Sequence, residues 1–339
     1  MTLIEFITAQ ARRLEDAQLA FGQGTTNAWD EAVWLTLWSL GLPLDTPLDD
    51  PATAPELNGI SQRFRLLSQI EKGTAAALFD KRIASRQPAA YLTREAWLQG
   101  VPFYVDERAI VPRSLIAEVL AEGSIDIWLS NDTRRVLDLC TGNGSLAVLA
   151  AMAWPDVTIT GADLSPDALA VARINVDKHG MSKRITLVES DGLAAFQAAP
   201  AHTTTGQTAR QAPQRFDLIL CNPPYVNADS MAALPPEFRA EPDMALSGNL
   251  AGGTDGMDFI RPLLAQAPAH MTPHAVLVLE IGHERPFFEA AFPTLDVVWL
   301  ATSSGDDLVL LVTREALLVW QATTPGGGIQ AEASAGGHP

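Results

Sequence analysis

The chain has 339 residues, 47% hydrophobic and 19% charged, which is long enough to bury a sizeable core in one or two domains. Its 40 acidic residues exceed its 23 basic ones, and the formal net charge of −17 argues against general nucleic-acid binding, because phosphate contacts need a cationic surface. No apolar run reaches the roughly 18 residues of a membrane span and no signal peptide is evident, so we expect a cytoplasmic protein without a membrane partner.

Cysteine and histidine usage indicates neither a disulfide framework nor a metal site. Cys140 and Cys221 each end an apolar run, which is typical of buried thiols in a reducing compartment. His270 and His274 are four residues apart, but Pro273 between them makes a helical ligand pair unfavourable. We expect no bound metal.

Residues 1–95 are predicted to form a helical domain that recognises the substrate. Asn27 is the expected cap of a helix that stops at Gly41 and Pro43, and further helices are predicted over 56–85. The basic residues of this last stretch form either a solvated helix face or a site for a structured, RNA-bearing partner.

Residues 96–114 change to a strand pattern. Pro102–Val105 and Ala109–Val111 flank Asp106–Arg108, which predicts a β-hairpin that links the helical domain to the rest of the chain.

From 115 to 318 the pattern alternates between strand and helix, which is typical of a doubly wound, mostly parallel α/β sheet. The predicted strands are Val136–Leu139, Val157–Ala162, Ile185–Glu189, Phe216–Cys221 and Val276–Ile281, followed by a closing β-hairpin of Asp296–Leu300 and Leu308–Thr313. Residues 197–214 have the composition of a surface insertion, and 319–339 that of a disordered tail.

A glycine-containing loop follows the first strand of this region. Gly142 and Gly144 allow the backbone to approach a ligand and turn into a helix, and the spacing fits a loose dinucleotide fingerprint. Asp163, at the end of the next strand, is placed to accept hydrogen bonds from a ribose diol. This half of the chain predicts an adenosine-containing cofactor, and by itself leaves nicotinamide open.

The fourth strand ends in Asn222-Pro223-Pro224-Tyr225. The prolines fix the backbone and lack N–H groups, so an amide, nearby carbonyls and an aromatic ring form a rigid cup for a planar group bearing NH2. Asp191, after the third strand, would accept from an adenine amine. No hydride-transfer motif is present at the strand ends, so transfer to nitrogen from S-adenosylmethionine is the prediction.

The residues Asp138–Gly144 with Asn222–Tyr225 resemble the amino-methylating S-adenosylmethionine-dependent methyltransferases. Further stretches resemble the protein-(glutamine-N5) methyltransferases, in the branch that acts on ribosomal protein L-three of the large subunit. They are Phe21–Thr25 with Asn27–Ala32, Arg86–Leu92, Phe103–Arg108 with Val111–Ser114, Glu241-Pro242 and Gly253–Gly256. The resemblance covers about residues 20–315. Departures from the family pattern occur at Ser303–Asp307 and in the insertion.

The resemblance implies a Rossmann-like methyltransferase domain that uses S-adenosylmethionine. The expected cofactor-binding residues are Asp138, Thr141, Gly142, Gly144, Asp163, Leu164, Asp191 and Asn222. The expected catalytic residues are Asn222, Pro223 and Tyr225, and substrate binding is expected to involve these together with Pro224 and Arg113. For Arg113, a structural salt bridge is the competing interpretation.

Three other functions stay open. The sister enzymes that methylate release-factor glutamines share the same core and cup. Adenine-N6 methylation would use the same cup, although the acidic charge disfavours it. A non-enzymatic cofactor-binding assembly factor is the remaining alternative. The sequence decides neither the target glutamine nor whether the substrate is the free ribosomal protein or an assembly intermediate.

Overall fold

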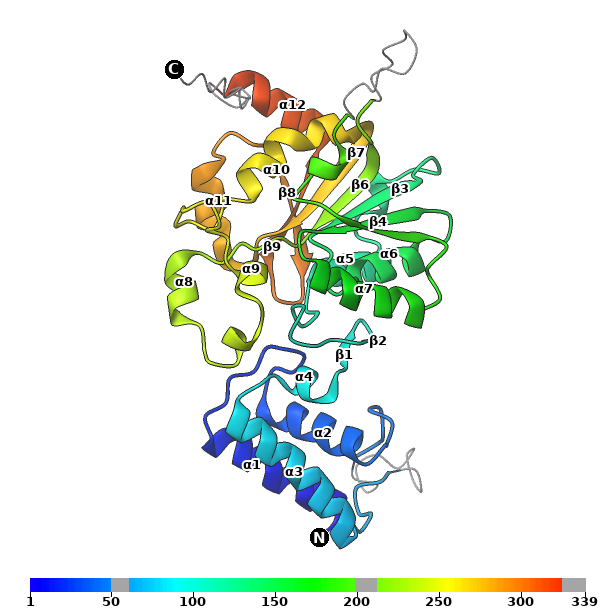
Figure 1. Cartoon of the computed structure of the whole chain (residues 1–339), viewed down its shortest axis with the longest axis vertical. Helices are drawn as coiled ribbons and strands as arrows, with labels where there is room; N and C mark the ends of the chain where they lie inside the picture. The colour runs from blue at the N-terminus through cyan, green and yellow to red at the C-terminus, as the bar shows by residue number, and fades with distance from the viewer. Residues whose placement is uncertain (50–60, 199–211, 325–339) are drawn as a thin grey trace, which may run out of the picture. The chain divides into compact units, whose positions relative to one another are not determined.

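The computed structural model describes residues 1–49, 61–198 and 212–324. These residues form two compact units (Figure 1). The first unit contains Met1–Arg113 together with Ala233–Asp243. The second contains Ser114–Ala232 and the described residues from Met244 onward.

The first unit is built from capped helices around an apolar core. Thr2 and Ser68 each form a capping box at a helix start, and Asn27 accepts from the Asp30 N–H as predicted. Leu14 and Phe79 are among the fully buried residues of the core. The helices are α1 (Leu3–Asp16), α2 (Ala28–Ser39), α3 (Gln69–Ser85) and α4 (Ala89–Thr93). Of the helical stretch predicted over 56–85, residues 56–60 lie outside the described part. Residues 61–68 are not helical, because α3 begins only at Gln69.

A β-hairpin is present, but at a different place from the prediction. Strands β1 (Ala96–Leu98) and β2 (Val101–Phe103) pair across Gln99-Gly100, both of which have positive φ. Two such residues give the turn the twist that a tight hairpin requires. A hydrogen-bonded turn is present where it was predicted, since the Ala109 N–H donates to the Asp106 carbonyl at 3.1 Å, but the segments on either side of it do not form the predicted strand pair.

The region 96–114 is also not a separate linker. Val105 and Val111 are buried in the core of the first unit, and the Tyr91 hydroxyl donates to the Ala109 carbonyl at 2.8 Å. Burial of Tyr91 raises the pKa of its hydroxyl, which is consistent with a structural hydrogen bond in the core.

Residues 233–243, predicted to lie within the catalytic range, belong to the first unit. The buried carboxylate of Glu241 accepts from the Val111 N–H at 2.8 Å and from Arg113 at 2.6 and 2.9 Å. A buried carboxylate needs such partners to offset its loss of hydration. These contacts explain why the segment joins a unit that is distant from it in sequence.

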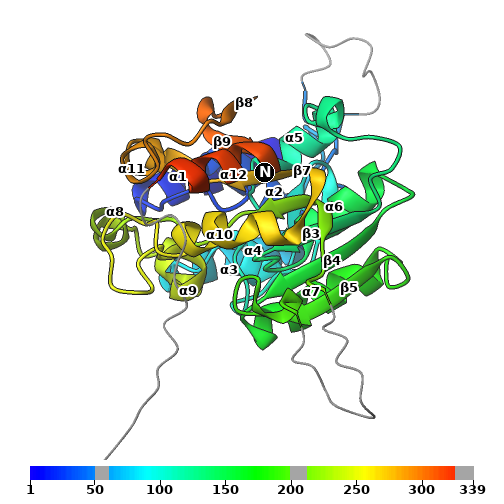
Figure 2. The same cartoon turned by 90° about the horizontal axis from the view of Figure 1, so that it is seen from above.

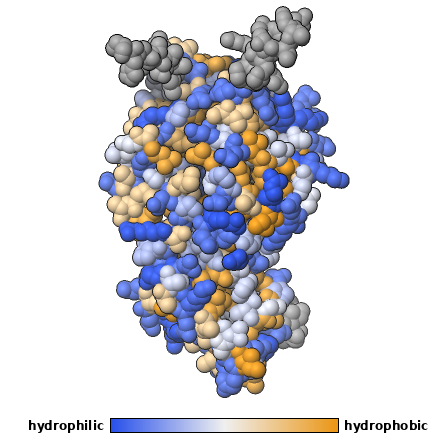
Figure 3. All heavy atoms as spheres, in the orientation of Figure 1, coloured by the Kyte–Doolittle hydropathy of each residue, from blue (hydrophilic) through white to orange (hydrophobic). Residues whose placement is uncertain are grey.

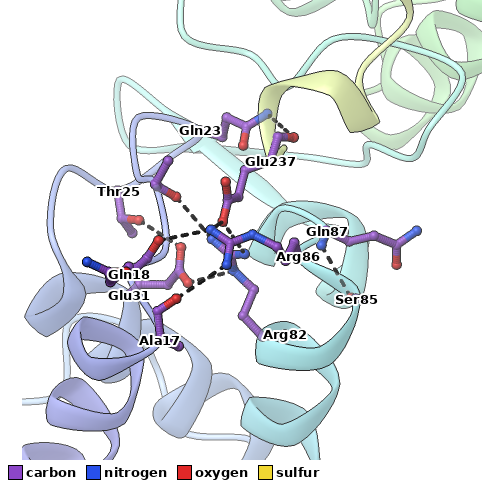
Figure 4. A network of polar contacts seen from close by, with 11 residues as sticks. Ala17, Gln18, Gln23, Thr25, Glu31, Arg82, Ser85, Arg86, Gln87 and Glu237 are labelled. Carbon is purple, nitrogen blue, oxygen red and sulfur yellow. Dashed lines mark hydrogen bonds and ion pairs between the residues drawn. The ribbon is translucent and has the colours of Figure 1, made fainter. Parts of the chain in front are cut away.

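Glu237, fully buried, is part of an ion network within the first unit (Figure 4). Its carboxylate oxygen Oε1 lies 2.7 Å from Nη2 of Arg86 and 3.9 Å from Nη1 of Arg82. Both arginines lie at the carboxyl-terminal end of α3. Arg82 in turn donates to Glu31 of α2 at 2.8 Å. Burial raises the pKa of Glu31, and the nearby Arg82 opposes that shift. The network joins α2, α3 and the 233–243 segment.

The second unit contains a twisted sheet in the order β5-β4-β3-β6-β7-β9-β8. Pairing is parallel from β5 to β7, while β9 is antiparallel to both β7 and β8. The strands are β3 (Arg135–Leu139), β4 (Thr158–Asp163), β5 (Ile185–Glu189), β6 (Phe216–Cys221), β7 (Met271–Glu280), β8 (Val298–Thr302) and β9 (Gly305–Thr313). The doubly wound sheet and its closing hairpin are therefore as predicted.

Helices cover both faces of this sheet. Figure 2 shows α10 and α12 on one side and α5 and α6 on the other. Successive residues of a strand point to opposite faces of the sheet. Leu137 and Leu139 therefore pack in the same hydrophobic core as α10 and α12, whereas Val136 points to the other face. The helices of this region are α5 (Ile116–Glu122), α6 (Ser145–Ala153), α7 (Pro166–Lys178), α8 (Ala228–Ala233), α9 (Asp243–Leu246), α10 (Ile260–Gln266), α11 (Arg285–Ala291) and α12 (Arg314–Thr323).

The end of the chain is ordered further than predicted. Thr313 caps α12, whose Leu317 and Trp320 are buried, and the Trp320 ring packs against Phe292 at 5.8 Å. The expectation of a tail from 319 is therefore wrong at its start, because this amphipathic helix continues to Thr323. The rest of the predicted tail, and most of the 197–214 insertion, lie outside the described residues.

Within the described ranges, the helices are too short or too polar to span a bilayer. On the face of the molecule seen in Figure 3, hydrophilic side chains are interspersed with small groups of hydrophobic ones.

The ion network predicts that Glu237→Gln lowers the free energy of unfolding by about 2–4 kcal/mol, because two arginines lose a buried counter-charge. Urea denaturation followed by circular dichroism measures this change. Asp80→Asn is the matched control, since Asp80 pairs with Arg13 at the surface and its loss should cost less than about 1 kcal/mol. Equal losses for the two variants would contradict this view of the network.

Candidate active site

The strand order brings two loops together at one edge of the sheet. β3 and β6 are parallel neighbours with Leu139 opposite Cys221, so the loops that begin at Cys140 and Asn222 start side by side. Asp163 ends β4, on the other side of β3. Ligands of doubly wound sheets bind where the strand order reverses in this way.

Hydrogen bonds fix the glycine loop against β4. Thr141 donates to the Asp138 carboxylate, which also accepts from the Ala147 N–H at 3.0 Å. The Gly142 N–H donates to Asp163 at 2.9 Å. Gly144 has a φ of 79°, and a Cβ there would lie 3.0 Å from the Cβ of Ala172 in α7. The structure thus brings together the predicted residues Asp138, Thr141, Gly142, Gly144 and Asp163.

Two buried polar atoms in this loop have no partner among the described residues. They are Oδ1 of Asp138 and Nδ2 of Asn143. Burial of the Asp138 carboxyl raises its pKa to about 7 and burial also raises the pKa of Asp163. Buried polar atoms are normally paired, so an unpaired acceptor and donor indicate a place for a polar ligand. The polar groups of S-adenosylmethionine fit this donor and acceptor set.

Two other predicted cofactor residues lie at the same edge of the sheet. Leu164 follows β4 and is 48% exposed, and Asp191 is exposed two residues after β5. The Ser190 N–H donates to the Asp163 carbonyl at 2.9 Å, which joins the two strand ends. Leu164 and Asp191 stay predictions as cofactor contacts.

The Asn222–Tyr225 motif combines a free amide with a fixed ring. The Asn222 side chain is partly exposed and has no hydrogen-bond partner in the described part of the chain, while Pro223 and Pro224 are buried. The Tyr225 hydroxyl donates to Glu280 of β7 at 3.4 Å. The amide is therefore available to a substrate.

Glu280 connects the motif to the start of α5. Its carboxylate accepts from the Ser114 hydroxyl and from the Leu115 N–H at 3.0 Å. A carboxylate at a helix amino terminus satisfies free N–H groups and interacts favourably with the helix dipole. Because these contacts fix the Glu280 carboxylate, its hydrogen bond with Tyr225 also fixes the position of the Tyr225 hydroxyl.

Close glycine contacts hold Tyr225 on two more sides. A Cβ at Gly282, where φ is 52°, would lie 2.6 Å from the Tyr225 ring. A Cβ at Gly256, where φ is 79°, would lie 2.0 Å from the Tyr225 carbonyl oxygen. Hydrogen bonds from Val226 to Leu246 and from Gly248 to Val226 continue this packing along the chain. The ring position is therefore set by neighbouring backbone.

Sequence reasoning missed Glu280 and Gly282. Glu280 lies in the apolar run of a predicted strand and is buried. An acidic residue within such a run is uncommon, and this was the feature of the sequence that could have identified it. The pairing of β6 with β7, which places it near Tyr225, could not be read from the motif. Gly256 belongs to a glycine-rich stretch that the sequence did flag, without its contact.

The structure places Arg113 in a salt bridge, which was the competing interpretation of this residue. Its guanidinium forms two hydrogen bonds with Glu241 in the first unit and lies 5.6 Å from the centre of the Phe238 ring. Through these contacts the planar guanidinium group of Arg113 stabilises the packing of that unit.

Cys140 and Cys221 are free thiols. Interaction with Cys221, together with burial, raises the pKa of the Cys140 thiol. The Cys140 thiol therefore remains neutral near pH 7.

The raised pKa of Asp138 predicts a pH-dependent stability in the absence of ligand. Its folded pKa of about 7 exceeds the ordinary 3.8, so its contribution is fully present below 3.8 and is lost as the pH rises through 7. Relative to Asp138→Asn, the wild type should lose up to about 1.4 kcal/mol per pH unit across that window. Urea unfolding at several pH values measures this, and a pH-independent difference would contradict the assignment.

Comparisons with known proteins identify relatives of this chain. The family model described as Methyltransferase small domain matches residues 124–234. A ribosomal protein uL3 glutamine methyltransferase of Bordetella pertussis is 48% identical over 93% of this chain and 96% of its own length. Its counterpart in Burkholderia pseudomallei is 45% identical over 93% and 95%. Among solved structures, a methyltransferase from Pyrococcus furiosus has a TM-score of 0.44 at 15% identity, covering 71% of this chain and 98% of that chain.

The assignment rests on the relatives, whose similarity extends over both units. The α/β sheet, the glycine loop and the motif after β6 are the structural features that accompany it. The chain belongs to the family of ribosomal protein uL3 glutamine methyltransferases.

Proposed function

We propose that this protein transfers a methyl group from S-adenosylmethionine to the side-chain amide nitrogen of a glutamine in ribosomal protein uL3, the L-three protein of the large subunit. The observation that supports this most strongly is 48% identity to a uL3 glutamine methyltransferase along 93% of the chain. The unpaired Asn222 amide beside the glycine loop provides a suitable place for the acceptor.

The cofactor site consists of the glycine loop and the neighbouring strand ends. Asp138, Thr141, Gly142, Gly144 and Asp163 would hold S-adenosylmethionine, with Leu164, Asp191 and Asn222 completing the site. Bound there, the cofactor supplies an electrophilic methyl group. The unpaired Oδ1 of Asp138 supports this placement.

The obstacle to the reaction is the weak nucleophilicity of an amide nitrogen, whose lone pair is delocalised into the carbonyl. The Asn222 side-chain oxygen and the Pro223 carbonyl each accept one N–H of the glutamine amide. These hydrogen bonds orient the nitrogen and stabilise the positive charge that develops on it. Tyr225, fixed by Glu280, packs on the amide with Pro224. A strong base is unnecessary before attack, since the nitrogen can lose its proton afterwards.

The first unit is the proposed substrate-recognition part. The sister substrates, release-factor glutamines, present the same amide, so the choice between them depends on contacts outside the motif. The substrate is either free uL3 or uL3 in a ribosomal assembly intermediate.

The test is transfer of labelled methyl groups into a lysate of cells that lack this enzyme. Label in uL3 supports the proposal, whereas label in release factors or in nucleic acid overturns it. Adding purified uL3 and isolated large-subunit precursors in separate reactions distinguishes the two forms of the substrate.

Asn222→Ala should lower kcat by at least about 10²–10³-fold, because it removes one of the two acceptors that orient the amide. Isothermal titration with S-adenosylmethionine should show a much smaller loss of affinity, because the other seven proposed cofactor residues are unchanged. Equal losses of turnover and cofactor affinity would contradict this division of roles.

Gly282→Ala should lower kcat by about tenfold or more, because the new methyl group displaces the Tyr225 ring. Gly180→Ala is the matched control: Gly180 has a similar φ of 67°, but a Cβ there meets no atom within 4 Å. Both substitutions introduce a similar backbone strain, because both glycines have a positive φ. A comparable loss of kcat in both variants would therefore refute the role of the Tyr225 contact.

A further inference from the structure

The first unit contains a pocket that the proposed chemistry does not use. Its volume is about 920 Å³. One wall comes from the end of α2 and the turn that follows it, and another from the start of β1. Every described residue that lines the pocket belongs to the first unit.

Three tryptophans give the pocket its character. Trp34 and Trp38 come from α2 and Trp97 from β1. Trp38 and Trp97 are 38% and 41% exposed, which is unusual for so large an apolar side chain. Exposed indole rings around a hollow are typical of a binding site, since their faces attract cations and stack on guanidinium groups.

The charges of the pocket all have one sign. Asp45 and Glu95 line it, and no lysine, arginine or histidine does so within the described residues. Glu95 also accepts from the Trp97 indole N–H at 2.8 Å, which fixes that ring beside the carboxylate. Within the described residues neither carboxylate has a cationic partner, and indole faces next to such carboxylates complement a cationic side chain.

A third observation concerns the Trp34 indole N–H. This atom is buried and has no acceptor in the described part of the chain. Such an atom is uncommon and calls for a physical reason. A peptide bound in the pocket that Trp34 lines would supply main-chain carbonyls, which are acceptors for such an N–H.

We propose that this pocket binds an arginine-bearing segment of the substrate protein and thereby contributes to substrate selection. The proposal rests on the proposed function for the identity of that substrate. The pocket takes the arginine between the tryptophan faces, with its charge toward Asp45 and Glu95. An acidic or purely apolar segment lacks the charge that these carboxylates would neutralise.

The double variant Asp45→Asn, Glu95→Gln removes both charges and retains an acceptor for Trp97. Methyl transfer to uL3 should show KM raised about tenfold, equivalent to about 1.4 kcal/mol, with kcat within about twofold of wild type. The control Glu15→Gln, Asp16→Asn makes the same charge change on the exposed end of α1 and should leave KM unchanged. A KM for the pocket variant equal to that of the control overturns the proposal.

A second measurement is independent of the enzyme's substrate. The indole N–H signals of Trp34, Trp38 and Trp97 are followed by NMR during titration with the acetylated peptide Gly-Arg-Gly-Arg-Gly and with its citrulline counterpart. The arginine peptide should shift these signals, and the uncharged citrulline peptide should shift them far less. No shift, or equal shifts, overturns the proposal. If the wild type fails to methylate uL3, the proposed function fails, and this titration still decides the role of the pocket.

Discussion

The parallel register of β3 and β6 is the constraint on which the active site depends. With Leu139 opposite Cys221, the glycine loop and the Asn222 motif must begin at neighbouring points on one sheet edge. Neither loop alone specifies methyl transfer. One contains unpaired buried polar atoms that are proposed to contact the cofactor, and the other contains the Asn222 amide that is proposed to hold the methyl-accepting glutamine. Their combination on adjacent strands makes transfer to nitrogen the chemistry that the fold supports.

Buried carboxylates organise the packing within each of the two units. Glu280 holds the Tyr225 hydroxyl and the start of α5 within the second unit. Glu237 and Glu241 perform a comparable task in the first unit, where they pair with arginines and a backbone N–H. The chain that leaves the motif thus runs into the first unit before it returns to the second at Met244.

Local signals made much of the fold predictable from sequence. The strand boundaries of β5 and β6 agree with the apolar runs, and Ser165 and Pro166 begin α7 as their types require. Pairings over long distances were not predictable. The assignment of 233–243 to the first unit depends on Glu241 meeting Val111, and the role of Glu280 depends on β7 lying beside β6. The hairpin was misplaced because the left-handed pair Gln99-Gly100 is a weaker sequence signal than Asp106–Arg108.

The most direct test of the account is mass spectrometry of uL3 peptides from cells that lack this enzyme, complemented with either the wild type or Asn222→Ala. The account predicts one glutamine-containing peptide that gains the mass of a single methyl group on its side-chain amide with the wild type, and none with the variant. A methyl group on any other residue type, or the same modified peptide with both proteins, would contradict it.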